Sequence, residues 1–167
     1  MNLLEELLEA WRYTRAGVIA EAENLPADRF LEKPDKLGRS PLDLVNHIVE
    51  SGWLMAGELA NPNGDFLRKS PDELTAEHTP RGDYSRDRAS ALAALRRSHE
   101  AGAAKIRAFG LDPMMQPIRQ FNGVPASRIS WMHHGISHEE YHRGQLALYA
   151  RLCDETPALT KLIYGGG

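Results

Sequence analysis

The chain has 167 residues, the size of one compact domain. Its 20 Lys and Arg residues against 23 Asp and Glu residues give a formal net charge of −3, which argues against a dedicated nucleic-acid binder. The single cysteine, Cys153, excludes an internal disulfide and a cysteine-rich zinc site. With 42% hydrophobic and 26% charged residues, the composition is that of a globular protein, and we expect one folded domain over residues 1–167.

Neither a secretory signal nor a membrane span is expected. The N-terminal segment carries Glu5, Glu6 and Glu9 where a secretory signal would carry Lys or Arg. The longest apolar runs are a few residues long, far below the roughly 20 that cross a bilayer. We therefore expect a cytoplasmic protein with neither nucleic-acid nor membrane partners.

Two helices are predicted in the first third of the chain. In residues 2–24 the hydrophobic side chains recur at alternating spacings of four and three, and Pro26 ends the pattern. The second helix, 41–59, begins with a Ser-Pro-Leu-Asp sequence in which Ser40 is the N-cap. An Asn-Pro-Asn-Gly sequence at 61–64 is a strong stop signal for this helix.

Two further helices are predicted at 85–109 and 126–153. The connection before the third helix takes about twenty residues, which is long enough to need partial order, and one helical turn is expected from Ser70. The loop before the fourth helix contains proline residues, and its portion 116–121 is compatible with extended chain.

Strand signals are nearly absent, because no run of β-branched and aromatic residues with period two occurs. The four amphipathic segments predict an all-α fold, namely a four-helix bundle. The connections are unequal in length, which predicts a long crossover rather than simple up-down-up-down order.

Histidines on the last predicted helix carry the strongest chemical signal. His134, His138 and His142 recur every four residues, so neighbouring pairs lie on one helical face. Two imidazoles at this spacing can bind one divalent ion, and a further ligand must come from another helix. His47 lies on the apolar face of the second helix, where its ring nitrogens need a partner. Three facing imidazoles with an open fourth position are typical of a catalytic metal site.

The other histidines have simpler interpretations. His99 is a rival ligand on the third predicted helix, but its neighbours also fit plain packing. His134 is expected beside the ion rather than bound to it, because one ion rarely spans three successive helical turns. His133 is rotated off the ligand face and His78 lies in the long connection, so both are expected to face solvent.

The string from His138 to His142 also matches the H-E-x-x-H signature of zinc proteases, in which Glu139 would be the general base. The extended signature needs Gly and His where Gln145 and Leu148 stand, and no upstream strand is predicted to bind a peptide. We therefore disfavour protease chemistry.

Two motifs resemble those of the DinB/YfiT-like superfamily. One is S-P-L…H-I…W-L from Ser40, and the other is H-E-x-x-H-R-G-Q-L from His138. The resemblance extends over nearly the whole chain and implies a four-helix bundle with long crossovers, often dimeric. It also implies that a zinc or nickel ion is held by His47, His138 and His142.

The resemblance implies a metal-dependent enzyme with a small-molecule substrate, and two chemistries remain open. The ion would activate either a low-molecular-weight thiol for transfer or isomerisation, or water for hydrolysis. A non-catalytic metal-binding stress-response bundle is the alternative, as is a metal-free bundle whose histidines hydrogen-bond to one another. Because ligating imidazoles must be neutral, metal occupancy is expected to fall below roughly pH 6. A homodimer is expected from the resemblance and from the long apolar helices.

No clear general base stands out in the sequence. Glu50, one turn beyond His47, and Glu139 are weak candidates, each with a solvated carboxylate as the alternative. Gln145 is a third weak candidate, expected to line the cavity or donate to a substrate, with a surface or interface amide as the alternative.

Two neighbouring residues of the second motif carry structural expectations. Gly144 inside a helix costs roughly 1 kcal/mol relative to Ala, which predicts the close approach of a neighbouring helix. Arg143 is expected to point outward and to pair with Glu139 or Glu140.

Overall fold

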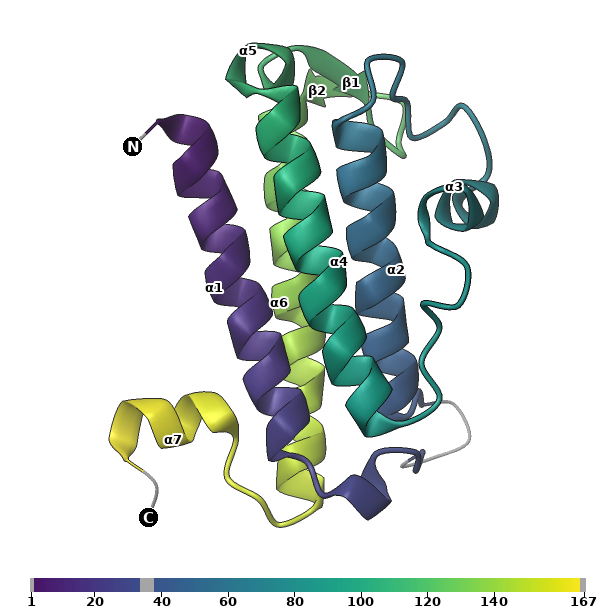
Figure 1. Ribbon diagram of the computed structural model, residues 1–167. Coiled ribbons are helices and arrows are strands. Elements are labelled where there is room, and N and C mark those ends of the chain that lie inside the picture. Colours follow the sequence, from purple (N-terminus) through teal and green to yellow (C-terminus); the bar gives the residue numbers. More distant parts are fainter. Residues whose placement is uncertain (1, 34–37, 166–167) are drawn as a thin grey trace.

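The computed structural model describes residues 2–33 and 38–165. Its four long helices form a bundle (Figure 1), so the predicted all-α class and bundle are confirmed. The third long helix begins three residues later than predicted, because the side chain of Asp87 accepts a hydrogen bond from the backbone of Ser90 and caps it. The four helices are α1 (Leu3–Asn24), α2 (Pro41–Leu59), α4 (Arg88–Phe109) and α6 (Arg128–Leu152).

Short elements occupy the connections. In the long one, α3 begins at a capping box of Ser70 and Glu73 and is longer than the single turn expected. The loop before α6 forms an antiparallel strand pair with Ile118 opposite Ala126, and its first strand lies within the portion 116–121 that is compatible with extended chain. The pairing itself was not predicted, because strands of three residues carry too little alternation. Within the described chain, no helix is both long and apolar enough to cross a membrane. The short elements are η1 (Ala27–Arg29), α3 (Pro71–His78), α5 (Leu111–Met114), β1 (Pro117–Arg119), β2 (Pro125–Ser127) and α7 (Ala158–Tyr164).

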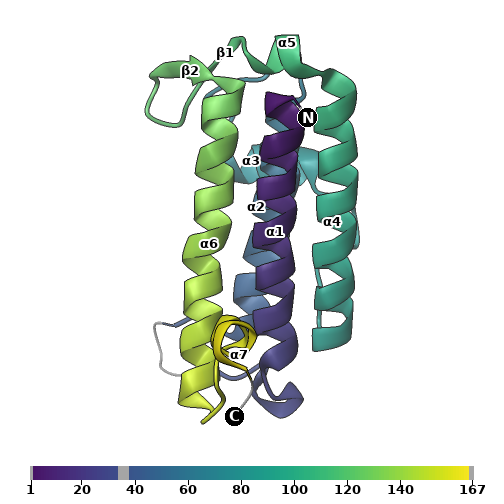
Figure 2. The same cartoon turned by 90° about the vertical axis from the view of Figure 1, so that its left-hand side faces the viewer.

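The order of the helices around the bundle differs from their order in the chain. α1 packs against α4 and α6, and α2 also packs against α4 and α6, so the consecutive helices α1 and α2 are diagonal to each other (Figures 1 and 2). α2 and α4 run in the same direction, which forces the chain between them to return along the length of the bundle (Figure 1). The predicted long crossover is therefore present, and α3 lies within it.

The apolar core consists of two clusters, one toward each end of the bundle. On α1, Trp11 belongs to one cluster and Val18 to the other, and the buried Arg15 lies between them. Each of the other long helices also carries polar or charged residues between its contributions to the two clusters. Five of these residues, joined by His47 of α2, form a polar layer across the middle of the bundle. The polar layer consists of Arg15, His47, Ser98, His138, Glu139 and His142.

A buried ion pair ties three helices together within the polar layer. The guanidinium of Arg15 on α1 donates to both carboxylate oxygens of Glu139 on α6, at 2.8 and 2.5 Å. It also donates to the carbonyl of Leu95 and to the hydroxyl of Ser98 on α4, at 2.6 and 2.8 Å. The indole nitrogen of Trp11 donates to Glu139 at 2.7 Å. Both charges are therefore paired and hydrogen-bonded, which a buried ion pair requires.

The expectation for Gly144 of α6 is wrong, and the expectation for Arg143 is correct only for its partner. In the described part of the chain, nothing outside the backbone of α6 itself lies within 4 Å of a Cβ placed at Gly144, so no neighbouring helix approaches it closely. Arg143 does pair with Glu140 at 3.2 Å, but it is 8% exposed and does not point outward. Its guanidinium covers Gly17 of α1, where a Cβ would lie 2.4 Å from the guanidinium carbon. The close approach therefore occurs at Gly17.

The crossover is anchored to α2 by the buried carboxylate of Glu58. This carboxylate accepts hydrogen bonds from Arg68 at 2.5 Å and pairs with Nε2 of His78 at 2.6 Å. The His78 side chain, expected to face solvent, is only 11% exposed and packs over Gly57. Because Arg68 and His78 lie in the crossover, these contacts hold α3 against α2.

Removing the carboxylate of Glu139 should destabilise the bundle strongly. Glu139→Ala leaves the charge of Arg15 buried without a partner, which costs about 3–5 kcal/mol of unfolding free energy. Urea denaturation followed by circular dichroism measures the change. Arg12→Ala, which breaks an exposed pair with Glu9, is the control and should change little. Equal denaturation midpoints for the two variants would contradict this account.

Candidate metal centre

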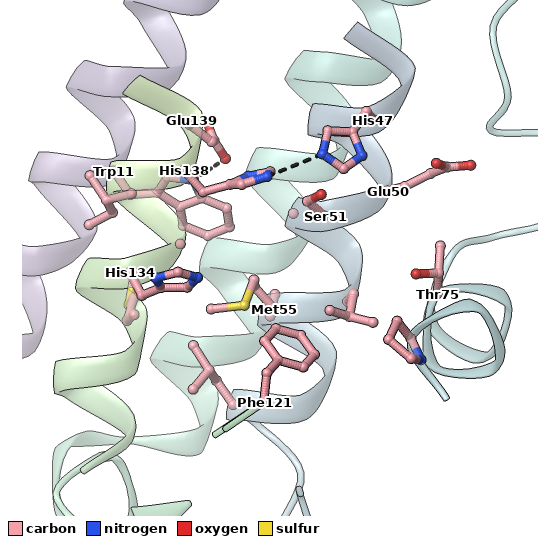
Figure 3. Close-up of a pocket in the computed structure, with 18 of the residues that line it drawn as sticks. Trp11, His47, Glu50, Ser51, Met55, Thr75, Phe121, His134, His138 and Glu139 are labelled. Carbon is pink, nitrogen blue, oxygen red and sulfur yellow. Dashed lines mark hydrogen bonds between the residues drawn. The ribbon is translucent and has the colours of Figure 1, made fainter. Parts of the chain in front are cut away.

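Three imidazoles from two helices meet in the polar layer. Nε2 of His138 lies 3.1 Å from Nε2 of His47 and 3.1 Å from Nε2 of His142. Each of the three residues offers a ring nitrogen within 4.8 Å of the other two. Figure 3 shows His47 of α2 facing His138 of α6. The structure thus brings together the three histidines that the sequence suggested as ligands.

The local sequence explains this convergence. The neighbours of His47, Ile48 and Val49, are fully buried in the apolar core, which fixes the rotation of α2. His138 and His142 are one helical turn apart and therefore share a face of α6. Tetrahedral zinc with Zn–N bonds of about 2.0–2.1 Å separates its nitrogen ligands by about 3.3 Å, close to the observed spacing. The donor set therefore fits a divalent transition-metal ion.

The environment keeps the three imidazoles neutral. Burial, followed by the positive charge of Arg39, lowers the pKa of His47 to about 4. Burial, followed by the neighbouring His142, lowers the pKa of His138 to about 4. Burial also lowers the pKa of His142 itself. All three rings are therefore unprotonated at neutral pH, which is the form that binds metal.

Gln145 fixes the orientation of one ring. Its side-chain oxygen Oε1 lies 2.7 Å from Nδ1 of His142. An amide oxygen only accepts, so Nδ1 carries the proton and Nε2 presents its lone pair to the other histidines. Gln145 was expected to line the cavity or donate to a substrate, or to be a surface or interface amide. It lines a second cavity, beside His142, and its oxygen is engaged by the ring of that histidine.

A hollow of about 400 Å³ opens beside His47 and His138 (Figure 3). We call it the inner hollow. Two of its walls come from connections rather than from the bundle: Thr75 belongs to α3, and Phe121 to the turn of the strand pair. The volume suits a small organic molecule. The residues lining it include Trp11, Glu50, Ser51, Leu54, Met55, Thr75, Ile106, Phe121, Met132, His134 and Ile136.

The two candidate bases occupy different environments. Glu50 lines the inner hollow, and burial raises its pKa. Glu139 also borders the hollow, but both of its oxygens accept hydrogen bonds, from Arg15 and from Trp11. A carboxylate engaged in this way holds the bundle together, so Glu50 is the better placed of the two to exchange a proton with a substrate.

The remaining histidines lie outside the cluster. His134 lines the inner hollow and stacks on Trp131, with ring centroids 4.2 Å apart and planes at 8°. His99 packs edge-on against Trp11 at 4.7 Å. His133 is exposed, as predicted.

A second group of possible ligands consists of Glu58, Glu77 and His78. Arg68 already donates to both of these carboxylates, at 2.5 Å each. This guanidinium supplies the positive charge that a cation would otherwise bring, so the group is an ion-pair network.

Two residues near the site were not predicted to act there. Arg15 falls on the apolar stripe of α1, and a charged residue at a core position is a signal of a buried partner. Arg39 precedes the N-cap of α2 and borders the inner hollow. Because Arg39 is an exposed residue in a connection, its sequence position does not indicate a role at the site.

The family and its fold are established by comparison. The sequence model of the DinB superfamily matches residues 10–146. YjoA, a DinB-like protein from Bacillus subtilis, is 20% identical with a TM-score of 0.70, over 90% of this chain and 93% of that one. YfiT from Bacillus subtilis, described as a probable metal-dependent hydrolase with an unusual four-helix bundle topology, is 11% identical with a TM-score of 0.71, over 93% and 91%.

A third similar structure is a mycothiol-dependent maleylpyruvate isomerase, 14% identical with a TM-score of 0.67, over 87% of this chain and 61% of that one. No curated protein sequence matches this chain. At these identities the structural likeness shows the fold, and the sequence model, which spans most of the chain, shows the family. The chain belongs to the DinB superfamily.

Proposed function

We propose that this protein is a metal-dependent enzyme acting on a small molecule. His47, His138 and His142 bind one divalent transition-metal ion, and the inner hollow binds the substrate. The observation that carries the proposal is a cluster of three neutral imidazoles, two of which, His47 and His138, line the wall of this hollow. A three-histidine site leaves a coordination position open, and a hollow beside that position favours catalysis over a purely structural ion.

The residues around the cluster have distinct roles in this proposal. A bound ion supplies Lewis acidity and lowers the pKa of a coordinated water or thiol. Gln145 holds the ring of His142 through Nδ1, and Glu50 exchanges a proton with the substrate at its carboxylate. The apolar wall that includes Met55 and Phe121 binds the substrate and excludes water.

Two chemistries follow from the related proteins, and zinc or nickel is the ion we propose. The description of YfiT supports hydrolysis of a small substrate, and the mycothiol-dependent isomerase supports reaction with a low-molecular-weight thiol. For either reaction, an ion held by His47, His138 and His142 would supply the acidity that makes a water or a thiol a better nucleophile.

Zinc titration of the purified protein should show about one equivalent per chain. His138→Ala or His142→Ala should abolish binding, and His47→Ala should weaken it strongly, because each removes one ligand. Isothermal titration calorimetry measures the affinity. His133→Ala removes an exposed imidazole of the same helix and should leave binding unchanged. Full affinity in His47→Ala would remove that residue from the site.

Replacing Gln145 should weaken the metal site without removing a ligand. Gln145→Leu abolishes the acceptor for Nδ1 of His142 and should reduce zinc affinity about 10–100-fold. Gln145→Glu restores an acceptor and should retain the affinity of the parent protein. If Gln145→Leu binds zinc as tightly as the parent protein, the orienting role is wrong.

Metal should be lost at a lower pH than an unperturbed histidine site would show. Because the pKa of His47 and His138 is lowered to about 4, protonation displaces the ion only as the pH falls toward that value. Occupancy measured by equilibrium dialysis should persist at pH 6 and fall between roughly pH 5 and 4. Circular dichroism at each pH checks that the fold is intact. Loss of half of the bound metal near pH 6.5 would show that the pKa of these imidazoles is not lowered.

A further inference from the structure

Two hollows, not one, border the histidine cluster. The inner hollow reaches His47 and His138. A second hollow of about 430 Å³, which we call the outer hollow, reaches His142. Because the three ring nitrogens lie within 4.8 Å of one another, a ligand in either hollow can reach the same ion. Arg39 borders both hollows.

The two hollows differ in charge. The inner hollow has the carboxylates of Glu50 and Asp72 at its edge, beside an apolar wall. The outer hollow has no carboxylate among the lining residues that the structure describes, and Arg39 is the charged residue there. Its other described walls are aromatic, amide or aliphatic, and include Tyr141, Gln145, Leu148 and Leu152. An anion is therefore favoured in the outer hollow and disfavoured in the inner one.

The guanidinium of Arg39 is available to such an anion. Arg39 is exposed, and in the residues with a described structure no carboxylate forms an ion pair with it. The positive charge of Arg39 acts on the site, because, after burial, it contributes most to lowering the pKa of His47. A guanidinium that no described carboxylate engages, at the edge of a hollow, is suited to bind a carboxylate, sulfonate or phosphate group.

We propose that the outer hollow binds an anionic second reactant through Arg39 while the inner hollow holds a neutral, mainly apolar reactant. This inference rests on the proposed metal-dependent function. It favours a reaction between two organic molecules over hydrolysis, because water as a nucleophile has no need of a second hollow of this size.

A pair of thiols matched in length tests the outer hollow. The cobalt-loaded protein is titrated with 3-mercaptopropane-1-sulfonate and with the neutral 3-mercapto-1-propanol, and thiolate-to-cobalt absorbance reports binding. The sulfonate should bind about tenfold more tightly than the alcohol, equivalent to about 1.4 kcal/mol. Arg39→Gln should remove this preference and leave the neutral thiol unaffected. Lys105→Gln, an exposed cation on α4 that borders neither hollow, is the control.

A neutral aromatic probe, 4-fluoroanisole, tests simultaneous occupancy. Its binding is followed by fluorine NMR with and without saturating 3-mercaptopropane-1-sulfonate. The probe should remain bound in both conditions and in Arg39→Gln. Phe121→Ala should weaken binding of the probe and leave binding of the sulfonate unchanged. Equal affinity of the two thiols, a preference that survives Arg39→Gln, absence of thiolate absorbance, or displacement of the probe by the sulfonate would each overturn the inference. Failure of the proposed function gives a different result: cobalt would then bind equally to the parent protein and to His47→Ala.

Discussion

The ion pair between Arg15 and Glu139 is the contact on which the rest of the structure depends. It joins α1 to α6 and, through Ser98, to α4. Glu139 follows His138 in the chain, so fixing its carboxylate against α1 turns the adjacent imidazole toward α2. Paired charges of this kind gain little stability over an apolar core, and their best-attested use is to specify one arrangement of helices. In this bundle the arrangement so specified is the one that brings the histidines together.

The composition of the polar layer also explains how a polar site can exist inside a small protein. Neutral imidazoles cost less to bury than charged ones, and the opposite charges of Arg15 and Glu139 cancel. The two apolar clusters on either side supply the hydrophobic burial that a continuous core would otherwise provide. The inner hollow lies next to this layer, so a bound molecule meets apolar wall at one end and the histidines at the other.

The sequence predicted the four long helices because caps, stop signals and periodicity are local properties, as at Ser40 and Pro26. It also predicted which three histidines would meet, since a shared helical face and an inward imidazole on another helix are visible in the pattern. The sequence did not predict the environment of residues whose contacts come from another element of the fold. Gly144 faces open space while Gly17 carries the close contact, and His78 is held by Glu58 from another element. Tertiary partners of this kind have no signal in a single sequence.

The histidines and part of the cavity wall lie in different kinds of segment, which affects how the sequence of this architecture can change. The histidines stand on α2 and α6, whereas part of the wall of the inner hollow belongs to α3 and the strand pair. Insertions or replacements in those connecting segments can therefore reshape the inner hollow without disturbing the three histidines, because surface connections tolerate change far better than packed helices do. One scaffold can thereby present cavities of different shape beside the same histidine cluster.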